Sequence, residues 1–293
     1  MLNVKSSQTT STSEVQGSGK FSITKLLKGW WRATWPPALI VVLIITIWQA
    51  IAMLLTNGLE EGTFAYRQQQ SMLPSPLKVI AAFFNYADVF LDAGRVTLTN
   101  AFIGFIIGAI IGFGLALLMD LARWVERSFY IYIVASQMIP VIALAPILYG
   151  IIKDETLLKI TISAYLTFFP VTVNVLKGLR SVNPTSLELL YTYATRRRDI
   201  YTKVRIPSSL PFLFNALKIA STSSLIGAIV AELMGGNEGI GVLIVKLQYS
   251  SYAASDKLWA LIIEAAFIGM IFFLAVNLLE RIVVPWQPEY RKK

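Results

Sequence analysis

Two carboxylates, Glu232 and Glu264, lie in long apolar stretches, and few other residue types in the chain could carry acid–base chemistry. The sequence contains no cysteine and no histidine. Disulfides, thiolate metal sites, histidine ligands and imidazole bases are therefore excluded. No carboxylates are paired at a spacing suited to catalysis, and no G-x-x-x-x-G-K-[ST] loop is present to hold a nucleotide phosphate. These residue types favour moving a solute over transforming one.

The elements that position these residues are membrane helices. Hydrophobic residues make up 55% of the chain and charged residues only 15%, whereas soluble domains carry about 25% charged residues. A bilayer core is crossed by about 20 apolar residues in a helix. We therefore predict an all-α integral membrane protein with six transmembrane helices. The predicted spans are residues 37–56, 97–119, 128–149, 157–177, 210–233 and 258–284.

The basic residues that give the chain its net charge of +9 are unevenly divided between the two sides of the membrane. With the N-terminus inside, 18 of the 26 lysines and arginines fall in the inner loops and tails, which predicts that both termini are cytoplasmic. No nucleic-acid partner is needed to explain the charge. We expect residues 1–35 to form a cytoplasmic disordered tail and an interfacial amphipathic segment. Residues 36–284 would then form the transmembrane domain, and residues 285–293 a cytoplasmic tail.

A soluble segment, residues 183–211, interrupts the apolar pattern. Asn183 can cap a helix and Pro184 suits its first turn. After the basic block at residues 196–198, a second short helix is expected, with Pro207 as its stop. Such a basic helix–turn–helix with one apolar face is suited to docking on a soluble partner. Four residues recur at helical spacing and predict that shared face: Leu187, Leu190, Tyr191 and Ala194.

This segment resembles the EAA loop of the permease subunits of bacterial ABC importers. That loop has a Glu, two small residues, a Gly and an I-x-L-P ending. Glu188 takes the Glu position and Ala194 the Gly position, while Leu189 and Leu190 replace the small residues. The segment 204–207 takes the ending. Residues expected to couple to an ATPase are Leu187, Glu188, Leu190, Tyr191, Ala194, Arg196, Arg197, Arg198, Ile206 and Pro207.

Four further stretches resemble permeases of the nitrate/sulfonate/taurine importer family. They are L-P-S-P-x-x-V at residues 73–79, an I-P-x-x-A-x-x-P stretch ending at 146, F-F-P-x3-N-x3-G at 168–178 and G-x-G-x-L-I at 239–244. In the second stretch, Gln137 stands where the family has Arg. The resemblance covers roughly residues 73–284 and implies the type I ABC importer permease fold.

The resemblance also implies partners. A permease of this kind lies in the bacterial plasma membrane and pairs with a second copy or a close paralogue. Cytoplasmic ABC ATPase subunits bind ATP and Mg²⁺ and dock on the EAA-like loops, so no cofactor is expected in this chain. An extracytoplasmic solute-binding protein delivers the solute.

Residues expected along the translocation pathway lie in the third, fourth and fifth predicted spans. Pro140 should kink its span. Gln137 faces the pathway or makes a helix–helix hydrogen bond, and Glu232 faces an outer gate or supports helix packing. Gly104, Gly108 and Gly112 predict close helix packing. The candidate pathway residues are Gln137, Pro140, Tyr165, Phe168, Asn174, Ser221, Ser224 and Glu232.

The sequence leaves alternatives open for the transported solute and for the energy source of transport. The family handles nitrate, sulfonates and taurine, and also vitamin precursors of the pyrimidine or riboflavin type. Few fixed positive charges lie in the predicted pathway, which favours a neutral or aromatic solute. An ion-gradient-driven secondary transporter, with Glu264 as a proton relay, is a different class. No internal repeat between residues 37–149 and 157–284 supports it. An intramembrane enzyme ranks last.

Overall fold

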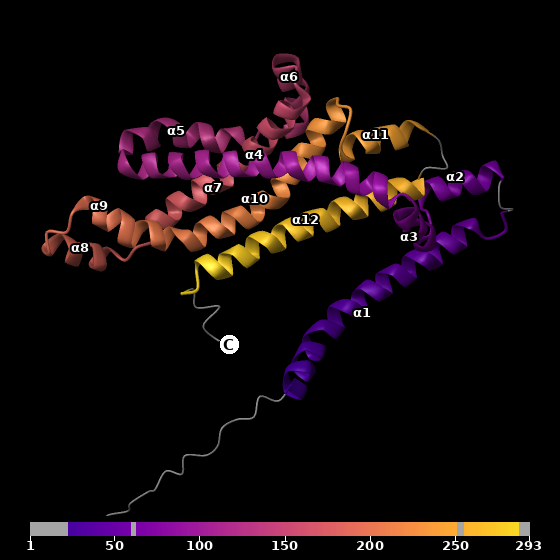
Figure 1. Cartoon of the computed structure of the whole chain (residues 1–293), viewed down its shortest axis with the longest axis horizontal. Helices are drawn as coiled ribbons and strands as arrows, with labels where there is room; N and C mark the ends of the chain where they lie inside the picture. The colour runs from indigo at the N-terminus through magenta and orange to yellow at the C-terminus, as the bar shows by residue number, and fades with distance from the viewer. Residues whose placement is uncertain (1–22, 60–62, 251–254, 287–293) are drawn as a thin grey trace, which may run out of the picture. The chain divides into compact units, whose positions relative to one another are not determined.

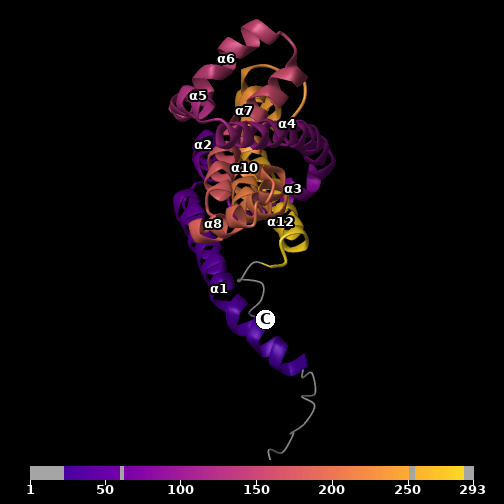
Figure 2. The same ribbon diagram turned by 90° about the vertical axis from the view of Figure 1, so that its left-hand side faces the viewer.

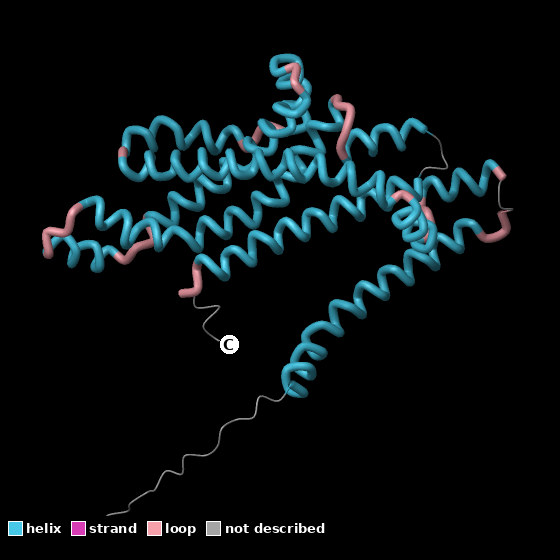
Figure 3. Tube along the Cα trace, viewed as in Figure 1, coloured by secondary structure: helices cyan, strands magenta, loops and turns pink. Residues whose placement is uncertain are grey.

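The computed structural model describes residues 23–59, 63–250 and 255–286, and within these ranges it contains helices and loops but no strand (Figure 3). The described residues divide between Ala50 and Ile51 into two compact units. The predicted all-α fold is confirmed. The tail expected to be disordered lies largely outside the described residues, as do residues 287–293.

The helices follow one another along the chain in the order labelled in Figure 1. Their bounds are α1 Ile23–Thr56, α2 Phe64–Met72, α3 Pro76–Asn85, α4 Ala87–Leu121, α5 Arg123–Ser136, α6 Val141–Ile152, α7 Glu155–Leu179, α8 Pro184–Thr192, α9 Arg197–Ile200, the π-helical turn η1 Tyr201–Arg205, α10 Ile206–Met234, α11 Ile240–Ser250 and α12 Ser255–Val283.

The described residues contain five helices long and apolar enough to cross a membrane, and up to six spans if the bent pair α5–α6 counts as one. The prediction of six spans is confirmed in this form. Two details differ. Helix α4 begins at Ala87, before the predicted 97, and the predicted span 128–149 is broken, with α5 and α6 meeting at 104°. Pro140 precedes α6 at this break, where its missing N–H interrupts the helical hydrogen bonds.

Helix α7 lies at the centre of the compact unit, and α4 and α10 both pack along it. Figures 1 and 2 show α5 and α6 on one side of this three-helix core and α12 on the other. A Cβ on Gly104 would lie 2.5 Å from the Ile160 carbonyl oxygen, and one on Gly108 2.5 Å from that of Ala164. The close packing that the glycines predicted is confirmed, because any larger side chain would separate α4 from α7.

The compact unit has two ends that differ in content. Helices α8 and α9 project at one end, beyond the last turns of α4 and α7 (Figure 1). Helices α2, α3 and α11 lie at the other end, near the start of α4. The long helices α4, α7, α10 and α12 run between the two ends.

Candidate functional site: a docking hairpin, an ionic cluster and a helix latch

We call residues 183–200, which comprise α8, α9 and their connection, the docking hairpin. Helix α8 begins as the sequence predicted. The Asn183 side chain accepts a hydrogen bond from the Thr185 N–H at 2.9 Å, and Pro184 occupies the first turn. This cap satisfies one of the free N–H groups at the helix start. None of the residues of α8 is buried, so the helix stands out from the bundle.

The end of α8 corrects the predicted helix face. The helix ends at Thr192, and Ala194 has a positive φ of 51°. The Ala194 N–H donates to the Tyr191 carbonyl at 2.9 Å, and the Thr195 N–H donates to the Leu190 carbonyl at 3.1 Å. This is the Schellman arrangement, in which glycine is the usual residue at the left-handed position. Ala194 therefore lies beyond the helix and shares no helical face with Leu187. Its backbone explains why the resembling motif carries glycine here.

The apolar surface of the docking hairpin includes residues that the sequence analysis did not select. Leu187 and Leu190 are only partly exposed, whereas Leu189, Tyr191 and Tyr193 are 56%, 59% and 75% exposed. Glu188 is also exposed. Two members of the face predicted from the sequence, Leu187 and Leu190, are thus partly covered, whereas Leu189 and Tyr193 expose their apolar surface. Large apolar side chains in a segment with many charged residues were the sequence signal that could have identified them.

The arginine block takes three different positions. Arg196 precedes α9 as its N-cap residue, and Arg198 is exposed. The Arg197 guanidinium donates to the Leu121 carbonyl at the end of α4, at 3.3 Å. Only Arg197 therefore ties the hairpin to the bundle directly, while its neighbours remain available to a partner.

The expected helix stop at Pro207 is wrong. Pro207 lies in the first turn of α10, which begins at Ile206 and follows α9 through η1 without a loop. A proline in a first turn costs no hydrogen bond, so the same residue that ends one helix can begin another. Ile206 packs against a buried cluster that includes Val175 and Leu179. The hairpin is thus continuous with a long membrane helix.

The Asp120 cluster, formed by Asp120, Glu126, Arg180, Tyr201 and Arg205, joins the hairpin to the bundle. The Asp120 carboxylate accepts hydrogen bonds from Arg205 at 2.5 Å, from the Tyr201 hydroxyl at 2.6 Å and from Arg180 Nε at 3.2 Å. Arg180 also donates two bonds to Glu126, at 2.6 and 2.8 Å. Those bonds to Glu126 raise the pKa of Arg180 above its ordinary value, so its charge is permanent. The cluster connects α4, α5, the end of α7, η1 and α10.

The α11 latch lies at the opposite end and consists of Thr97, Lys159, Glu232, Ile240 and Gly241. The buried Glu232 carboxylate accepts from the Thr97 hydroxyl at 2.9 Å and from the Gly241 N–H at 2.8 Å. The Thr97 hydroxyl oxygen accepts from the Ile240 N–H at 2.9 Å. Side chains from α4 and α10 thereby cap the first turn of α11, where a negative charge is stabilised by the helix dipole.

A buried lysine completes the latch. Lys159 is 3% exposed. Its Nζ donates to the Glu238 carbonyl at 2.8 Å and lies 3.9 Å from a Glu232 carboxylate oxygen. The Glu155 carboxylate accepts from the Asn237 backbone N–H at 3.0 Å. The loop between α10 and α11 is therefore held at two points by α7, through the side chains of Lys159 and Glu155. In this arrangement Glu232 supports helix packing, one of its two predicted roles.

The remaining candidate pathway residues do not share one cavity. Gln137 and Pro140 are exposed at the α5–α6 break. Tyr165 lies beside that break, because its hydroxyl donates to the Ser136 carbonyl, and its ring lies 6.1 Å from that of Phe168. These four residues form one group.

The other pathway candidates are satisfied inside the helical core. Asn174 donates to the Pro170 carbonyl at 2.7 Å within α7. Ser221 and Ser224 are buried at the seam of α7 and α10, and the Ser163 hydroxyl donates to the Ser224 carbonyl at 2.9 Å. Glu264 is buried beside Gly94 of α4, and its carboxylate oxygens have no hydrogen-bond partner among the described residues.

Comparison with known proteins places this architecture in a family. Residues 96–287 match the family model described as "Binding-protein-dependent transport system inner membrane component". The formylaminopyrimidine transport permease protein ThiX of Halalkalibacterium halodurans is 32% identical over 252 residues, which cover 86% of this chain and 95% of that protein. The nitrate import permease protein NrtB of a Synechocystis species is 23% identical, with 85% and 89% covered.

A solved structure supports the fold independently. The crystal structure of an amino acid ABC transporter with histidines aligns with a TM-score of 0.57 at 18% identity, covering 71% of this chain and 98% of that one. The type I importer fold predicted from the sequence is confirmed. The chain belongs to the family of inner membrane components of binding-protein-dependent transport systems, and it is the permease subunit of an ABC importer.

Proposed function

We propose that the docking hairpin receives a cytoplasmic ABC ATPase and passes its motion to the membrane helices. The observation that supports it is that α8 has no buried residue, and that the docking hairpin exposes Leu189, Tyr191 and Tyr193 near exposed arginines. A surface with apolar anchors and a charged rim suits a soluble protein partner and not lipid tails. Under this proposal the hairpin end and both termini are cytoplasmic, and the membrane is the bacterial plasma membrane.

The Asp120 cluster provides the route for the motion. Its bonds join η1, which follows the hairpin directly, to α4, and α4 to the end of α7, so a displacement of the hairpin that moves η1 acts on both helices. ATP and Mg²⁺ are bound by the ATPase, and this chain needs no cofactor of its own. Two permease copies, identical or paralogous, would each present one hairpin to an ATPase dimer, whose closure draws the hairpins together.

The opposite end receives the solute-binding protein, and the solute we propose is a pyrimidine of the formylaminopyrimidine type. The support is the 32% identity to the Halalkalibacterium permease over 95% of that protein, against 23% for the nitrate permease. A small neutral solute also agrees with the pairing of two lysines of the helical core, Lys159 with Glu232 and Lys218 with Glu280.

The docking proposal is tested with Leu189→Asp, which places a charge in the exposed apolar surface without touching the bundle. The tagged chain is purified from its native membrane, and both co-purifying ATPase and ATP-driven uptake of formylaminopyrimidine are measured. We expect at least tenfold less ATPase and uptake, because a buried unpaired charge at an interface costs several kcal/mol, roughly 2–5. Leu77→Asp on α3, where Leu77 is 66% exposed at the opposite end, is the matched control and should retain the ATPase.

Two results would overturn the proposal. Wild-type amounts of ATPase with Leu189→Asp would show that α8 is not the docking surface. Uptake that persists without ATP and stops with an ionophore would show that an ion gradient drives transport. Uptake of nitrate in place of formylaminopyrimidine would reject the solute assignment alone and leave the docking assignment intact.

A further inference from the structure

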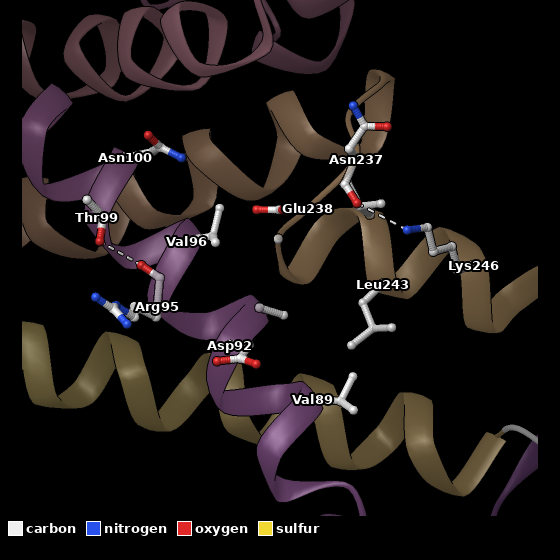
Figure 4. A pocket seen from close by; sticks show the side chains of 13 residues that line it. Val89, Asp92, Arg95, Val96, Thr99, Asn100, Asn237, Glu238, Leu243 and Lys246 are labelled. Carbon is white, nitrogen blue, oxygen red and sulfur yellow. Dashed lines mark hydrogen bonds between the residues drawn. The ribbon is translucent and has the colours of Figure 1, made fainter.

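A cavity of about 690 Å³ lies between the first half of α4 and the segment that runs from Asn237 into α11 (Figure 4). It is at the end opposite the docking hairpin, beside the α11 latch. A volume in this range suits an organic solute of moderate size. A small inorganic ion would leave most of it to water.

Three hydrogen-bonding side chains, Asp92, Asn100 and Glu238, are among the residues that line this cavity. Figure 4 shows the Glu238 carboxylate pointing from the segment before α11 toward Val96 of α4. Asn100 is only 7% exposed, and its amide has no hydrogen-bond partner in the described ranges 23–59, 63–250 and 255–286. The amide atoms of Asn100 are not among the polar atoms that are shut off from solvent, so water or a solute in the cavity can pair with them.

The two cations of the lining do not neutralise these carboxylates. Arg95 leaves α4 on the side away from Glu238 (Figure 4). Lys246 Nζ donates to the Asn237 carbonyl at 3.1 Å. Neither Asp92 nor Glu238 forms an ion pair with any described residue. The lining thus carries two carboxylates and two cations, and its carboxylates and its amide oxygen can accept hydrogen bonds from N–H donors.

Apolar side chains supply the rest of the wall. Val89, Val96 and Leu243 line the cavity between the polar groups. A flat ring can lie against such a surface while substituents at its edge reach the carboxylates. The arrangement thus fits a heterocycle with amino groups better than a sulfonate or nitrate, whose oxygens can only accept hydrogen bonds.

We propose that this cavity is a solute site of the permease itself, which binds an amino-substituted heterocycle after the binding protein releases it. Asp92 and Glu238 accept hydrogen bonds from the amino groups, and Asn100 pairs with a ring nitrogen or a carbonyl. The inference rests on the proposed function, since it assigns a place on the pathway to the same solute. The latch beside it fixes the Glu238 backbone through Lys159, so the position of one acceptor is set before the solute arrives.

The first experiment measures binding directly. The permease–ATPase complex, purified without its binding protein and placed in lipid nanodiscs, is titrated with radiolabelled formylaminopyrimidine. We expect a saturable site that Asp92→Asn and Glu238→Gln each weaken about tenfold, since one charged hydrogen bond is lost. Asp88→Asn is the control, because Asp88 is exposed one turn earlier on α4 and does not line the cavity. It should bind like the wild type.

The second experiment uses the absence of natural cysteines in this chain. Thr99→Cys places a single thiol in the cavity wall, and Leu91→Cys places one on α4 outside the cavity, at a residue that is 64% exposed. Formylaminopyrimidine should slow labelling of Cys at position 99 by a methanethiosulfonate reagent and leave position 91 unchanged. Nitrate should protect neither position.

The outcomes separate the cavity from the solute assignment. If the complete importer takes up formylaminopyrimidine while Asp92→Asn and Glu238→Gln bind and transport normally, the cavity proposal fails and the proposed function stands. If position 99 is protected but uptake of formylaminopyrimidine is absent, the solute assignment fails and the site stands. Loss of paired permeases in both variants would overturn the site and make this face an interface between copies.

Discussion

Asp120 and Glu232 are both nearly buried carboxylates that connect a short helical element to the long helices, but their partners differ in exposure. The Asp120 side chain is only 3% exposed, yet it binds arginines that are 42% and 19% exposed at the hairpin end. Glu232 is buried among Thr97, Lys159 and backbone N–H groups at the other end. Ion pairs open to water are weak and exchange easily, whereas a buried charge is strongly held to its partners. We therefore expect the ion pairs at the docking end to break and re-form readily, and the hydrogen bonds beside the solute cavity to stay in place.

The largest effect should come from Glu232→Ala. The substitution leaves Lys159 buried without a counter-charge and removes the cap of α11. We expect a loss of about 3–5 kcal/mol of stability, the usual cost of breaking a buried pair from one side. Thermal unfolding in detergent and hydrogen exchange of α11 would measure it. Thr97→Val removes one hydroxyl only and should cost less, about 1–3 kcal/mol. Equal stability of Glu232→Ala and wild type would show that the latch is not rigid.

Glu264 sharpens the comparison because it is a buried carboxylate without the partners that Glu232 has. Glu264→Leu keeps a similar volume and removes the two unpaired oxygens. We expect a gain of about 1–3 kcal/mol, because an unsatisfied buried polar group is lost. Glu264→Gln retains polar atoms and should change stability less. A clear loss of stability in the leucine variant would mean that the carboxylate has a partner in the assembled importer.

The Asp120 cluster should respond to charge and to salt, in contrast to the latch. Asp120→Asn removes the shared counter-charge of Arg180 and Arg205, and we expect a stability loss of about 1–3 kcal/mol, because a nearly buried carboxylate loses its charged hydrogen bonds while the arginines stay partly hydrated. Uptake per ATP hydrolysed should fall more, since the connection between η1 and the long helices is weakened. Asp199→Asn disrupts an exposed pair between the hairpin and Lys203 of η1 and is the control.

Raising the salt concentration offers a second measure of the same contrast. The screening length falls from about 10 Å at 0.1 M to about 3 Å at 1 M salt. Coupling of ATP hydrolysis to uptake should therefore weaken with salt in the wild type, and Asp120→Asn should already show that weakened state. Hydrogen exchange of α11 should not change. A salt-sensitive α11 with salt-insensitive coupling would reverse the comparison.

How well a feature could be predicted from the sequence depends on how far apart along the chain the residues that determine it lie. The Asn183 cap and the break before Pro140 were readable, because each depends on a few adjacent residues. The role of Pro207 was misread, because a proline has the same local signature after one helix and at the start of the next. The two clusters were not readable at all. Asp120 meets Arg205, 85 residues away, and Thr97 meets Glu232, 135 residues away, only through the packing of the long helices.

The smallest expected effect tests whether strain in the docking hairpin matters. Ala194 holds a positive φ of 51°, and a non-glycine residue in that conformation costs about 1–2 kcal/mol. Ala194→Gly removes this cost but loosens the unfolded chain, by about 0.5–1 kcal/mol. The net gain should be under about 1 kcal/mol, visible as slower hydrogen exchange at the end of α8.

Lys153 is a second non-glycine residue with a positive φ, so the same substitution can be tested there at a distance from the docking hairpin. It holds a similar positive φ of 54° where α6 ends, away from the hairpin. Lys153→Gly should relieve a similar local strain without changing ATPase binding. If the strain at Ala194 helps to shape the docking surface, Ala194→Gly alone will alter the affinity for the ATPase. If both variants bind the ATPase equally, the left-handed residue merely ends α8, and the exposed apolar side chains alone define the docking surface.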